Sequence, residues 1–250
     1  MAWDDGLTAD QRKEISLAEY MRDHIGYFPT TGISRMELIA ELAKRLKNGY
    51  QGPVPDYGDR FVLWDCDHQS QWDKDADDTK KDCGPACVET VCKYVTGNVT
   101  GPGTNEIMRF ITGGTDRSTS LSELQKAAKE LYGVTMTRHD GASIAQVIGW
   151  INAKRPPIIL VKYGYFIMRL DRKYESGHFM VAVGRDRFVT NGVPVERIYV
   201  HDPDWWDPYM GQGAFIPVTH HHFFQMWDGA KDDKGPGWQN PARAALVPVL

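Results

Sequence analysis

The order in which helix-forming and strand-forming segments follow one another constrains the fold of this chain most strongly. Helix signals dominate the first part of the sequence, whereas short runs of β-branched and apolar residues dominate the last part. We expect strands in these runs, at Ile158–Val161, Phe179–Val183, Arg197–Val200 and Ala214–Val218. Helices followed by strands, rather than the two in alternation, predict an α+β domain with an antiparallel sheet.

The helices of this domain are predicted from the residues at their ends. Ser120 and Ser143 each begin a capping box, in which the Ser and a Glu or Gln three positions later bind each other's backbone N–H groups. Another helix is expected at Gly84–Val95, where Gly97 follows its last turn. Thr219 is expected to cap a short helix that continues to Trp227.

The chain has 250 residues, which is enough for one large domain or for one domain with an appendage. Residues 1–50 carry the signals of two helices, and 51–60 are rich in Gly and Pro, which is typical of a linker. We therefore expect a helical N-terminal extension (1–50), a linker (51–60) and a main domain (61–250) that begins with a strand at Phe61–Trp64. The extension either packs on the main domain or binds a docking partner, and the sequence leaves both open.

Charge and hydropathy exclude several classes of function. The net charge of -4 provides no large positive field for a phosphate backbone, so a dedicated nucleic-acid-binding protein is not expected. The longest apolar run, Pro156–Val161, is far too short to span a bilayer. The N-terminus has neither the basic nor the apolar segment of a secretory signal. We expect a protein that is cytoplasmic as synthesised, with later release or association with a virion left open.

One of the four cysteines stands at a position suited to a nucleophile. In the string DCGPAC, Cys83 lies where a loop becomes a helix, because Pro is favoured in the first helical turn. The positive end of the helix dipole favours the thiolate form of a thiol at that place. Cys87 and Cys92 fall inside the same helix and are expected to be buried structural residues, which is also the alternative for Cys83.

A histidine and an aspartate lie at the ends of two neighbouring predicted strands. His178 stands at the start of one strand, and Asp202 follows the end of the next. If these strands pair in antiparallel fashion, the start of one lies near the end of the other, so the two side chains become neighbours. A cysteine nucleophile needs such a base and a group that orients the base. A hydrogen-bonded core residue is the alternative for a single histidine on a strand.

No metal ion and no other cofactor is expected. His220, His221 and His222 follow one another at a helix start, where successive side chains point about 100° apart and do not converge on one ion. Neither Cys66 with His68 nor the pair of cysteines within the predicted helix matches the usual spacing of zinc ligands.

Four motifs follow one another along the chain: Ser70-Gln71-Trp72-Asp73, Asp82 to Cys87, Gly177 to Val181, and His201-Asp202-Pro203. Together they resemble the bacteriocin-processing-peptidase-like branch of the papain-like cysteine peptidases. The resemblance covers roughly residues 61–230 and does not extend to residues 1–50. It implies a papain-like fold, in which a helix that starts at the nucleophile packs on an antiparallel sheet.

The resemblance also implies a role for each matching residue. Cys83 would be the nucleophile, His178 would take its proton and later protonate the leaving group, and Asp202 would orient the imidazole. The side-chain amide of Gln71 would stabilise the oxyanion together with the backbone N–H of Cys83, and Gln69 is a competing candidate for that amide.

Three further residues are candidates for contact with the substrate. Trp72 follows the proposed oxyanion glutamine, Gly177 leaves space beside the histidine, and Trp205 belongs to the acidic, aromatic segment Asp202–Tyr209. Tryptophans make large rigid contacts, which suits a loop that binds substrate. A loop packed over the end of the sheet explains the same segment equally well.

These residues predict a thiol hydrolase that cleaves peptide (amide) bonds through an acyl-enzyme intermediate. Its substrate would be a protein, a leader peptide or a peptidoglycan peptide, and the last of these suits a phage or lysis protein. An acyltransferase or transpeptidase with the same triad is an alternative. A non-catalytic, peptidase-like component of a larger assembly, for example a phage, is another, although an intact set of Cys83, His178 and Asp202 argues against it.

Overall fold

The computed structural model describes residues 56–72, 81–115, 117–166, 177–190, 193–205, 213–232 and 241–250. The helices expected within 1–50 lie outside these residues.

The described chain alternates between helices and strands more than the sequence predicts. The strands are β1 (Asp56–Val62), β2 (Met136–His139), β3 (Ile158–Lys162), β4 (Gly177–Thr190), β5 (Val193–His201), β6 (Ile216–Thr219) and β7 (Ala245–Pro248). The helices are α3 (Cys83–Thr96), α4 (Thr104–Thr112), α5 (Leu121–Tyr132), α6 (Ile144–Asn152) and α7 (His220–Asp228), with short 3-10 turns η1 (Tyr163–Tyr165) and η3 (Gly229–Asp232).

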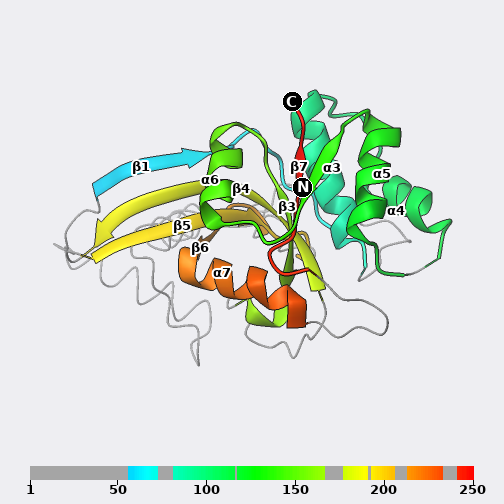
Figure 1. Cartoon of the computed structure of the whole chain (residues 1–250). Helices are drawn as coiled ribbons and strands as arrows, with labels where there is room; N and C mark the ends of the chain where they lie inside the picture. The colour runs from blue at the N-terminus through cyan, green and yellow to red at the C-terminus, as the bar shows by residue number, and fades with distance from the viewer. Residues whose placement is uncertain are drawn as a thin grey trace, which may run out of the picture.

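All strands belong to one sheet, in the order β2-β7-β3-β4-β5-β6, with β1 added beside β4. Every pairing between these strands is antiparallel. The long strand β4 pairs with β3 near its start, where His178 lies opposite Val161, and with β1 farther along. Figure 1 shows β1, β4 and β5 as the long strands that extend away from the helical layer of α3, α4 and α5.

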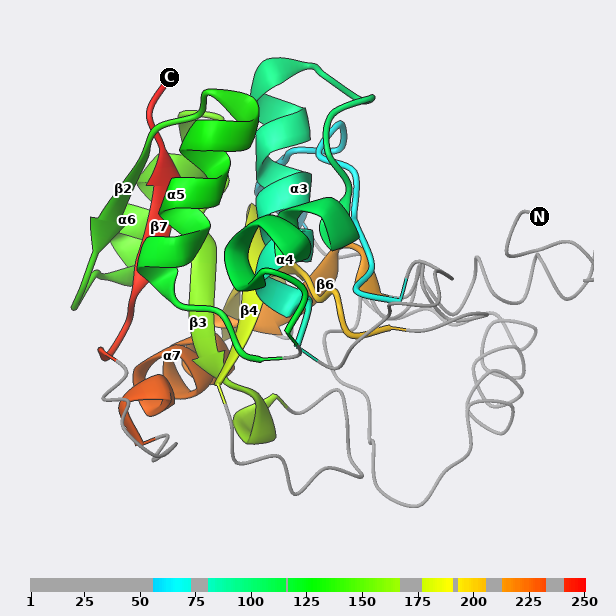
Figure 2. The ribbon, with the colours of Figure 1, turned by 90° about the vertical axis from the view of Figure 1, so that its right-hand side faces the viewer.

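The sheet separates two apolar cores, one on each face. On one face, Ile158 and Leu160 of β3 pack with buried residues of α3 and α5. On the other face, Ile159 and Val161 of the same strand pack with buried residues of α6 and α7. Successive side chains of a strand point to opposite faces, so β3 is apolar throughout because both of its faces are buried. Figure 2 shows α3, α4 and α5 together on their side of the sheet.

The predicted α+β architecture, with a helix packed on an antiparallel sheet, is confirmed. Helix α3 begins at Cys83 and ends at Gly97, whose positive φ of 66° is readily adopted by glycine. The capping boxes at Ser120 and Ser143 start α5 and α6, and the Thr219 hydroxyl accepts a hydrogen bond from the first turn of α7.

The structure differs from the sequence prediction at the start of the main domain. Strand β1 begins at Asp56, so residues 56–60 of the predicted linker (51–60) form part of the sheet. Proline and glycine suggested a linker, but the backbone from Asp59 onward pairs with β4, which offers an unpaired edge beyond β3. Helix α4 (nine residues) and strands β2 and β7 (four residues each) were not predicted, because short segments give weak local signals.

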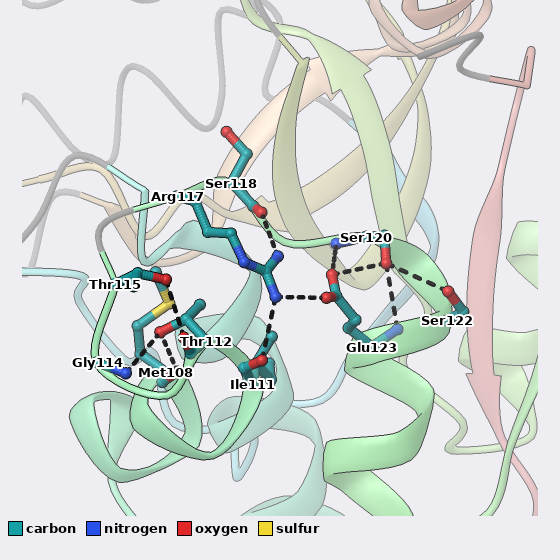
Figure 3. Close-up of polar contacts among 10 residues, drawn as sticks. All are labelled: Met108, Ile111, Thr112, Gly114, Thr115, Arg117, Ser118, Ser120, Ser122 and Glu123. Atoms are coloured by element: carbon teal, nitrogen blue, oxygen red, sulfur yellow. Dashed lines mark hydrogen bonds and ion pairs between the residues drawn. The ribbon is translucent and has the colours of Figure 1, made fainter. Parts of the chain in front are cut away.

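The loop between α4 and α5 is held by a compact polar network, drawn in Figure 3. The Arg117 guanidinium donates to Glu123 at 2.7 Å and to the carbonyl of Ile111 at 3.1 Å. Glu123 also accepts from the backbone N–H of Ser120 at 2.8 Å. The hydrogen bond from Arg117 lowers the pKa of Glu123 to about 2, so the carboxylate stays charged at neutral pH.

None of the helices in the described ranges is long and apolar enough to cross a membrane.

Candidate active site

Cys83 is the first residue of α3, which points its N-terminus toward the end of β4 that carries His178. Pro85 stands in the first helical turn, where its missing N–H would have no helical partner in any case. All four cysteines lie in the described residues, and Cys83 is the one that is partly exposed. Burial raises the pKa of Cys66 and Cys87 and raises that of Cys92 to about 12, so these three are poorly suited to nucleophilic attack.

The antiparallel sheet brings His178 and Asp202 together, as the sequence predicts. In the pairing of β4 with β5, Val181 lies opposite His201, so Asp202 stands just beyond the strand end and beside the start of β4. The Nε2 atom of His178 lies 2.8 Å from Oδ1 of Asp202. The same imidazole is hydrogen-bonded to Cys83, which leaves its Nδ1 atom for the thiol. The histidine therefore links the thiol to the carboxylate.

The electrostatics of this cluster favour an imidazolium. Burial alone lowers the pKa of His178, but the negative charge of the Cys83 thiolate and the hydrogen bond to Asp202 outweigh it and raise that pKa to about 10. Burial raises the pKa of Asp202, but the hydrogen bond and the charge of His178 lower it more, and its net pKa lies below the usual value. Both partners are thus charged at neutral pH.

Asp202 is fully buried, and hydrogen bonds satisfy both of its carboxylate oxygens. Besides His178, Oδ1 accepts from the backbone N–H of Asp204 at 3.0 Å. Oδ2 accepts from the Tyr163 hydroxyl at 2.9 Å and from the indole N–H of Trp205 at 3.0 Å. The ring of Tyr163 also stacks on the His178 imidazole, with centroids 4.0 Å apart. Trp205 thus supports the carboxylate, and its predicted contact with substrate stays a prediction.

Gln71 is buried beside the segment that follows Asp202. Its backbone N–H donates to the carbonyl of Pro203 at 2.9 Å, and its side-chain Nε2 lies 3.4 Å from Oδ1 of Asp204. The same oxygen accepts from the indole N–H of Trp72 at 2.9 Å. The backbone N–H of Gln69, the competing candidate, donates to the Thr90 hydroxyl at 3.2 Å. Thr90 stands about 10 Å along α3 from the nucleophile, at 1.5 Å per residue.

Two further histidines, the buried His201 and the half-buried His68, hold the end of β5 in place. His201 donates from Nε2 to the carbonyl of Cys66 at 2.7 Å and accepts at Nδ1 from the N–H of Phe215 at 3.0 Å. His68 lies 2.8 Å from the carbonyl of Asp202. Burial lowers the pKa of His68 and lowers that of His201 to about 3, so both are neutral at the pH where His178 is charged.

The sequence profile of one protein family matches residues 64–228, which include every residue of this cluster. That family is described as the Peptidase_C39 like family. The chain belongs to it. Membership identifies the papain-like α+β fold and implies a protein of the cysteine peptidase type.

Among solved structures, the chain is similar to the crystal structure of a protein from Bacillus anthracis described as a C39-like peptidase. The two share 14% sequence identity and superpose with a TM-score of 0.49, over 77% of this chain and 98% of the other. A comparison with the curated proteins found no match.

The C39-like cluster needs no metal ligands to explain its contacts. Within the ranges that the structure describes, no three His, Cys, Asp or Glu side chains gather as a group that could hold a metal ion. Of the three consecutive histidines, His220 pairs with Glu196 at 3.2 Å and His222 contacts the Thr219 hydroxyl at 3.1 Å. The rings of His221 and His222 lie with their centroids 5.5 Å apart.

Sequence reasoning missed Tyr163 and Asp204 in this C39-like site. Tyr163 directly follows β3, whose last residue, Lys162, lies opposite Gly177. The pairing of β3 with β4 would have placed it beside His178, but neighbouring strands cannot be chosen from their composition. Asp204 belongs to the acidic, aromatic segment that the sequence singles out, and only the fold shows that it faces Gln71. Gly177 begins β4 next to the imidazole, and its contact with substrate stays a prediction.

Proposed function

We propose that this protein is a thiol hydrolase that cleaves peptide (amide) bonds through Cys83, His178 and Asp202. The observation that carries the proposal is the single imidazole that is hydrogen-bonded to Cys83 on one side and lies 2.8 Å from Asp202 on the other. A nucleophile, a base and a group that orients the base form the minimal set for acyl transfer by a thiol. The partial exposure of Cys83 supports access by a substrate.

In the proposed reaction the proton of the Cys83 thiol already resides on His178 before substrate binds, since the pKa of His178 is raised to about 10. The thiolate attacks the carbonyl carbon of the substrate, and the oxyanion accepts hydrogen bonds from the backbone N–H of Cys83 and the amide of Gln71. The C–N bond breaks as His178 protonates the leaving amine, which leaves a thioester on Cys83. Water then loses a proton to His178, attacks the thioester and releases the carboxylic acid and the thiol.

Several contacts support these roles. The four hydrogen bonds to Asp202 keep it ionised and fix its orientation, so that it holds the Nε2 side of the imidazole. The backbone bond from Gln71 to Pro203, the residue after Asp202, supports the choice of Gln71 over Gln69. We take the substrate to be a protein or a peptidoglycan peptide. The same acyl-enzyme would serve a transferase if an amine replaced water.

The first test is the rate at which iodoacetamide alkylates Cys83 between pH 4 and 9, with the site located by peptide mass spectrometry. A free thiol has a pKa of about 8.5, so at pH 5 roughly one in 3,000 such thiols is ionised, whereas a histidine-paired thiol remains ionised. We expect rapid labelling of Cys83 at pH 5, at least tenfold faster than in His178→Ala. Cys66, Cys87 and Cys92 are buried and serve as internal controls.

Labelling that rises only above pH 8, or that spreads evenly over the four cysteines, would overturn the proposal. If labelling behaves as expected, peptides, proteins and peptidoglycan are the substrates to compare. Addition of hydroxylamine to the acyl-enzyme then shows whether an amine competes with water as the acceptor.

A further inference from the structure

The carboxylate of Asp204 connects two parts of the proposed site. Its backbone N–H donates to Asp202 at 3.0 Å, while its side-chain Oδ1 lies 3.4 Å from Nε2 of Gln71. Asp204 is 5% exposed and Gln71 is 2% exposed, so both groups are shielded from water. One buried residue therefore contacts both the orienting carboxylate and the amide proposed to bind the oxyanion.

The backbone on both sides of this contact is fixed by hydrogen bonds. Gln71 donates its N–H to the carbonyl of Pro203 at 2.9 Å, and the Ser70 hydroxyl donates to the carbonyl of Trp205 at 2.8 Å. The N–H of Trp72 donates to the Ser70 hydroxyl at 3.0 Å. With the main chain held, the remaining freedom of Gln71 is the rotation of its side chain and the choice of which end of the amide faces Asp204.

A carboxylate oxygen that already accepts from Trp72 resolves that choice, because it acts as a hydrogen-bond acceptor. The NH2 end of the amide must face Asp204, and the carbonyl end must face away. In agreement with this, Oε1 of Gln71 has no hydrogen-bond partner within the described residues. An NH2 group carries two N–H bonds, so one N–H can face Asp204 while the other remains for an oxyanion.

We propose that Asp204 is a positioning residue that fixes the amide of Gln71 with an N–H directed at the oxyanion. The inference rests on the proposed function, since it gives Gln71 the oxyanion role. Asp204 acts through Gln71 and does not touch the substrate. An amide at position 204 would weaken the constraint, because its oxygen carries no negative charge and its NH2 end could instead donate to Oε1 of Gln71, at the cost of the hydrogen bond from Trp72.

The test compares two reactions of the same thiol. Alkylation by iodoacetamide is a displacement at carbon that builds no oxyanion, so its rate depends on the thiolate and not on Gln71. Acylation by p-nitrophenyl acetate passes through a tetrahedral oxyanion and releases p-nitrophenolate as an acetyl thioester forms on Cys83. The p-nitrophenolate release from Cys83→Ala is subtracted, so that only acylation of the nucleophile is counted.

In Asp204→Asn we expect acylation to slow by at least tenfold, while alkylation at pH 5 stays within about twofold of the wild-type rate. Gln71→Ala should slow acylation by a factor on the order of 10²–10³, as the loss of one oxyanion donor does. The double variant should be no slower than Gln71→Ala alone, because Asp204 has no amide left to position. Glu89→Gln is the matched control: it also changes a buried carboxylate into an amide, and it should alter neither rate.

Three results would overturn the inference: unchanged acylation in Asp204→Asn, equal losses of acylation and alkylation, or additive losses in the double variant. Equal losses would mean that Asp204 acts on the triad through Asp202 instead. Failure of the proposed function is detected separately, by comparing the labelling of Cys83 at pH 5 in wild-type and His178→Ala protein. If Cys83 shows no histidine-dependent labelling at pH 5, the function fails and the inference fails with it.

Discussion

The charge of His178 depends on two neighbours whose contributions differ in size. The thiolate of Cys83 is the largest cause that raises its pKa to about 10, and the hydrogen bond to Asp202 comes next. Cys83→Ser removes the negative charge, whereas Asp202→Asn keeps an oxygen that can accept from Nε2. We expect both variants to lower the pKa of His178, and Cys83→Ser to lower it more.

NMR titration of 13C-labelled histidine measures this order directly, with His178→Gln to assign the signal. Wild-type His178 should keep its proton from pH 7 to about 10, and each variant should lose it within that interval. Equal pKa values in the wild type and in Cys83→Ser would contradict the ion pair.

At the scale of single residues, the sequence predicted the parts of the site that have a local signature. Cys83 was identified by the helix start that Pro85 marks, and His178 and Asp202 by their places at strand ends. Tyr163 and Asp204 carry no such signature. Their contacts form because β3 pairs with β4 and because residues 70–72 run beside 203–205, and both are properties of the tertiary structure.

At the scale of elements, the close approach of α3 to the start of α5 depends on Gly84, which has no side chain. A Cβ at Gly84 would lie 2.5 Å from Oγ1 of Thr119 and 3.0 Å from Cδ2 of Leu124. Thr119 directly precedes the capping box of α5, in the loop that Arg117 and Glu123 hold in place (Figure 3). The loop has little freedom to yield, so a methyl group at Gly84 should displace the first turn of α3.

We therefore expect Gly84→Ala to lower the free energy of unfolding by about 1–3 kcal/mol, as overpacking does. Because Cys83 is the neighbouring residue, its alkylation at pH 5 should slow as well. Urea unfolding and iodoacetamide labelling measure the two effects. A second substitution, Thr119→Ala, removes Oγ1 and should recover part of both losses, whereas Thr119→Ser keeps Oγ1 and should recover neither. Equal recovery by the two would contradict the steric explanation.

Some helices and strands were predicted from the sequence and others were not, for a physical reason. Capping boxes and β-branched runs are local, so the starts of α5 and α6 and nearly the whole of β3 were predicted correctly. The order of strands is not local: β7, at the end of the chain, pairs with both β2 and β3 in the sheet. A four-residue strand such as β2 gains its stability from those partners, and its sequence alone gives little sign of it.

At the scale of the whole molecule, His201 and His68, whose pKa values burial lowers, make stability depend on pH. His201 links the end of β5 to the carbonyl of Cys66 and to the N–H of Phe215, and it does so as a neutral ring. Its pKa is lowered to about 3 in the folded protein, from 6.5 in an unfolded chain. Between these values the unfolded state binds a proton that the folded state does not. Stability therefore falls as the pH falls below 6.5.

The slope from this one group is about 1.4 kcal/mol per pH unit, or roughly 2 kcal/mol between pH 6.5 and 5. His68, whose pKa is also lowered by burial, changes stability in the same direction. In His201→Gln the amide can still donate and accept but does not titrate, so urea unfolding over this interval should show a smaller slope. Equal slopes for the two proteins would contradict the assignment.

The dependence of stability on pH also affects how the alkylation of Cys83 by iodoacetamide is interpreted. Cys66, Cys87 and Cys92 are buried, so they react with iodoacetamide only when the protein unfolds. If acid unfolds the molecule, labelling spreads to these three cysteines, whereas an activated thiol in folded protein confines it to Cys83. The comparison uses urea concentrations at which wild-type and His201→Gln protein are equally stable at pH 7. As the pH is lowered, labelling should stay confined to Cys83 down to a lower pH in His201→Gln than in the wild type. Labelling that spreads at the same pH in both would show that another group controls acid unfolding.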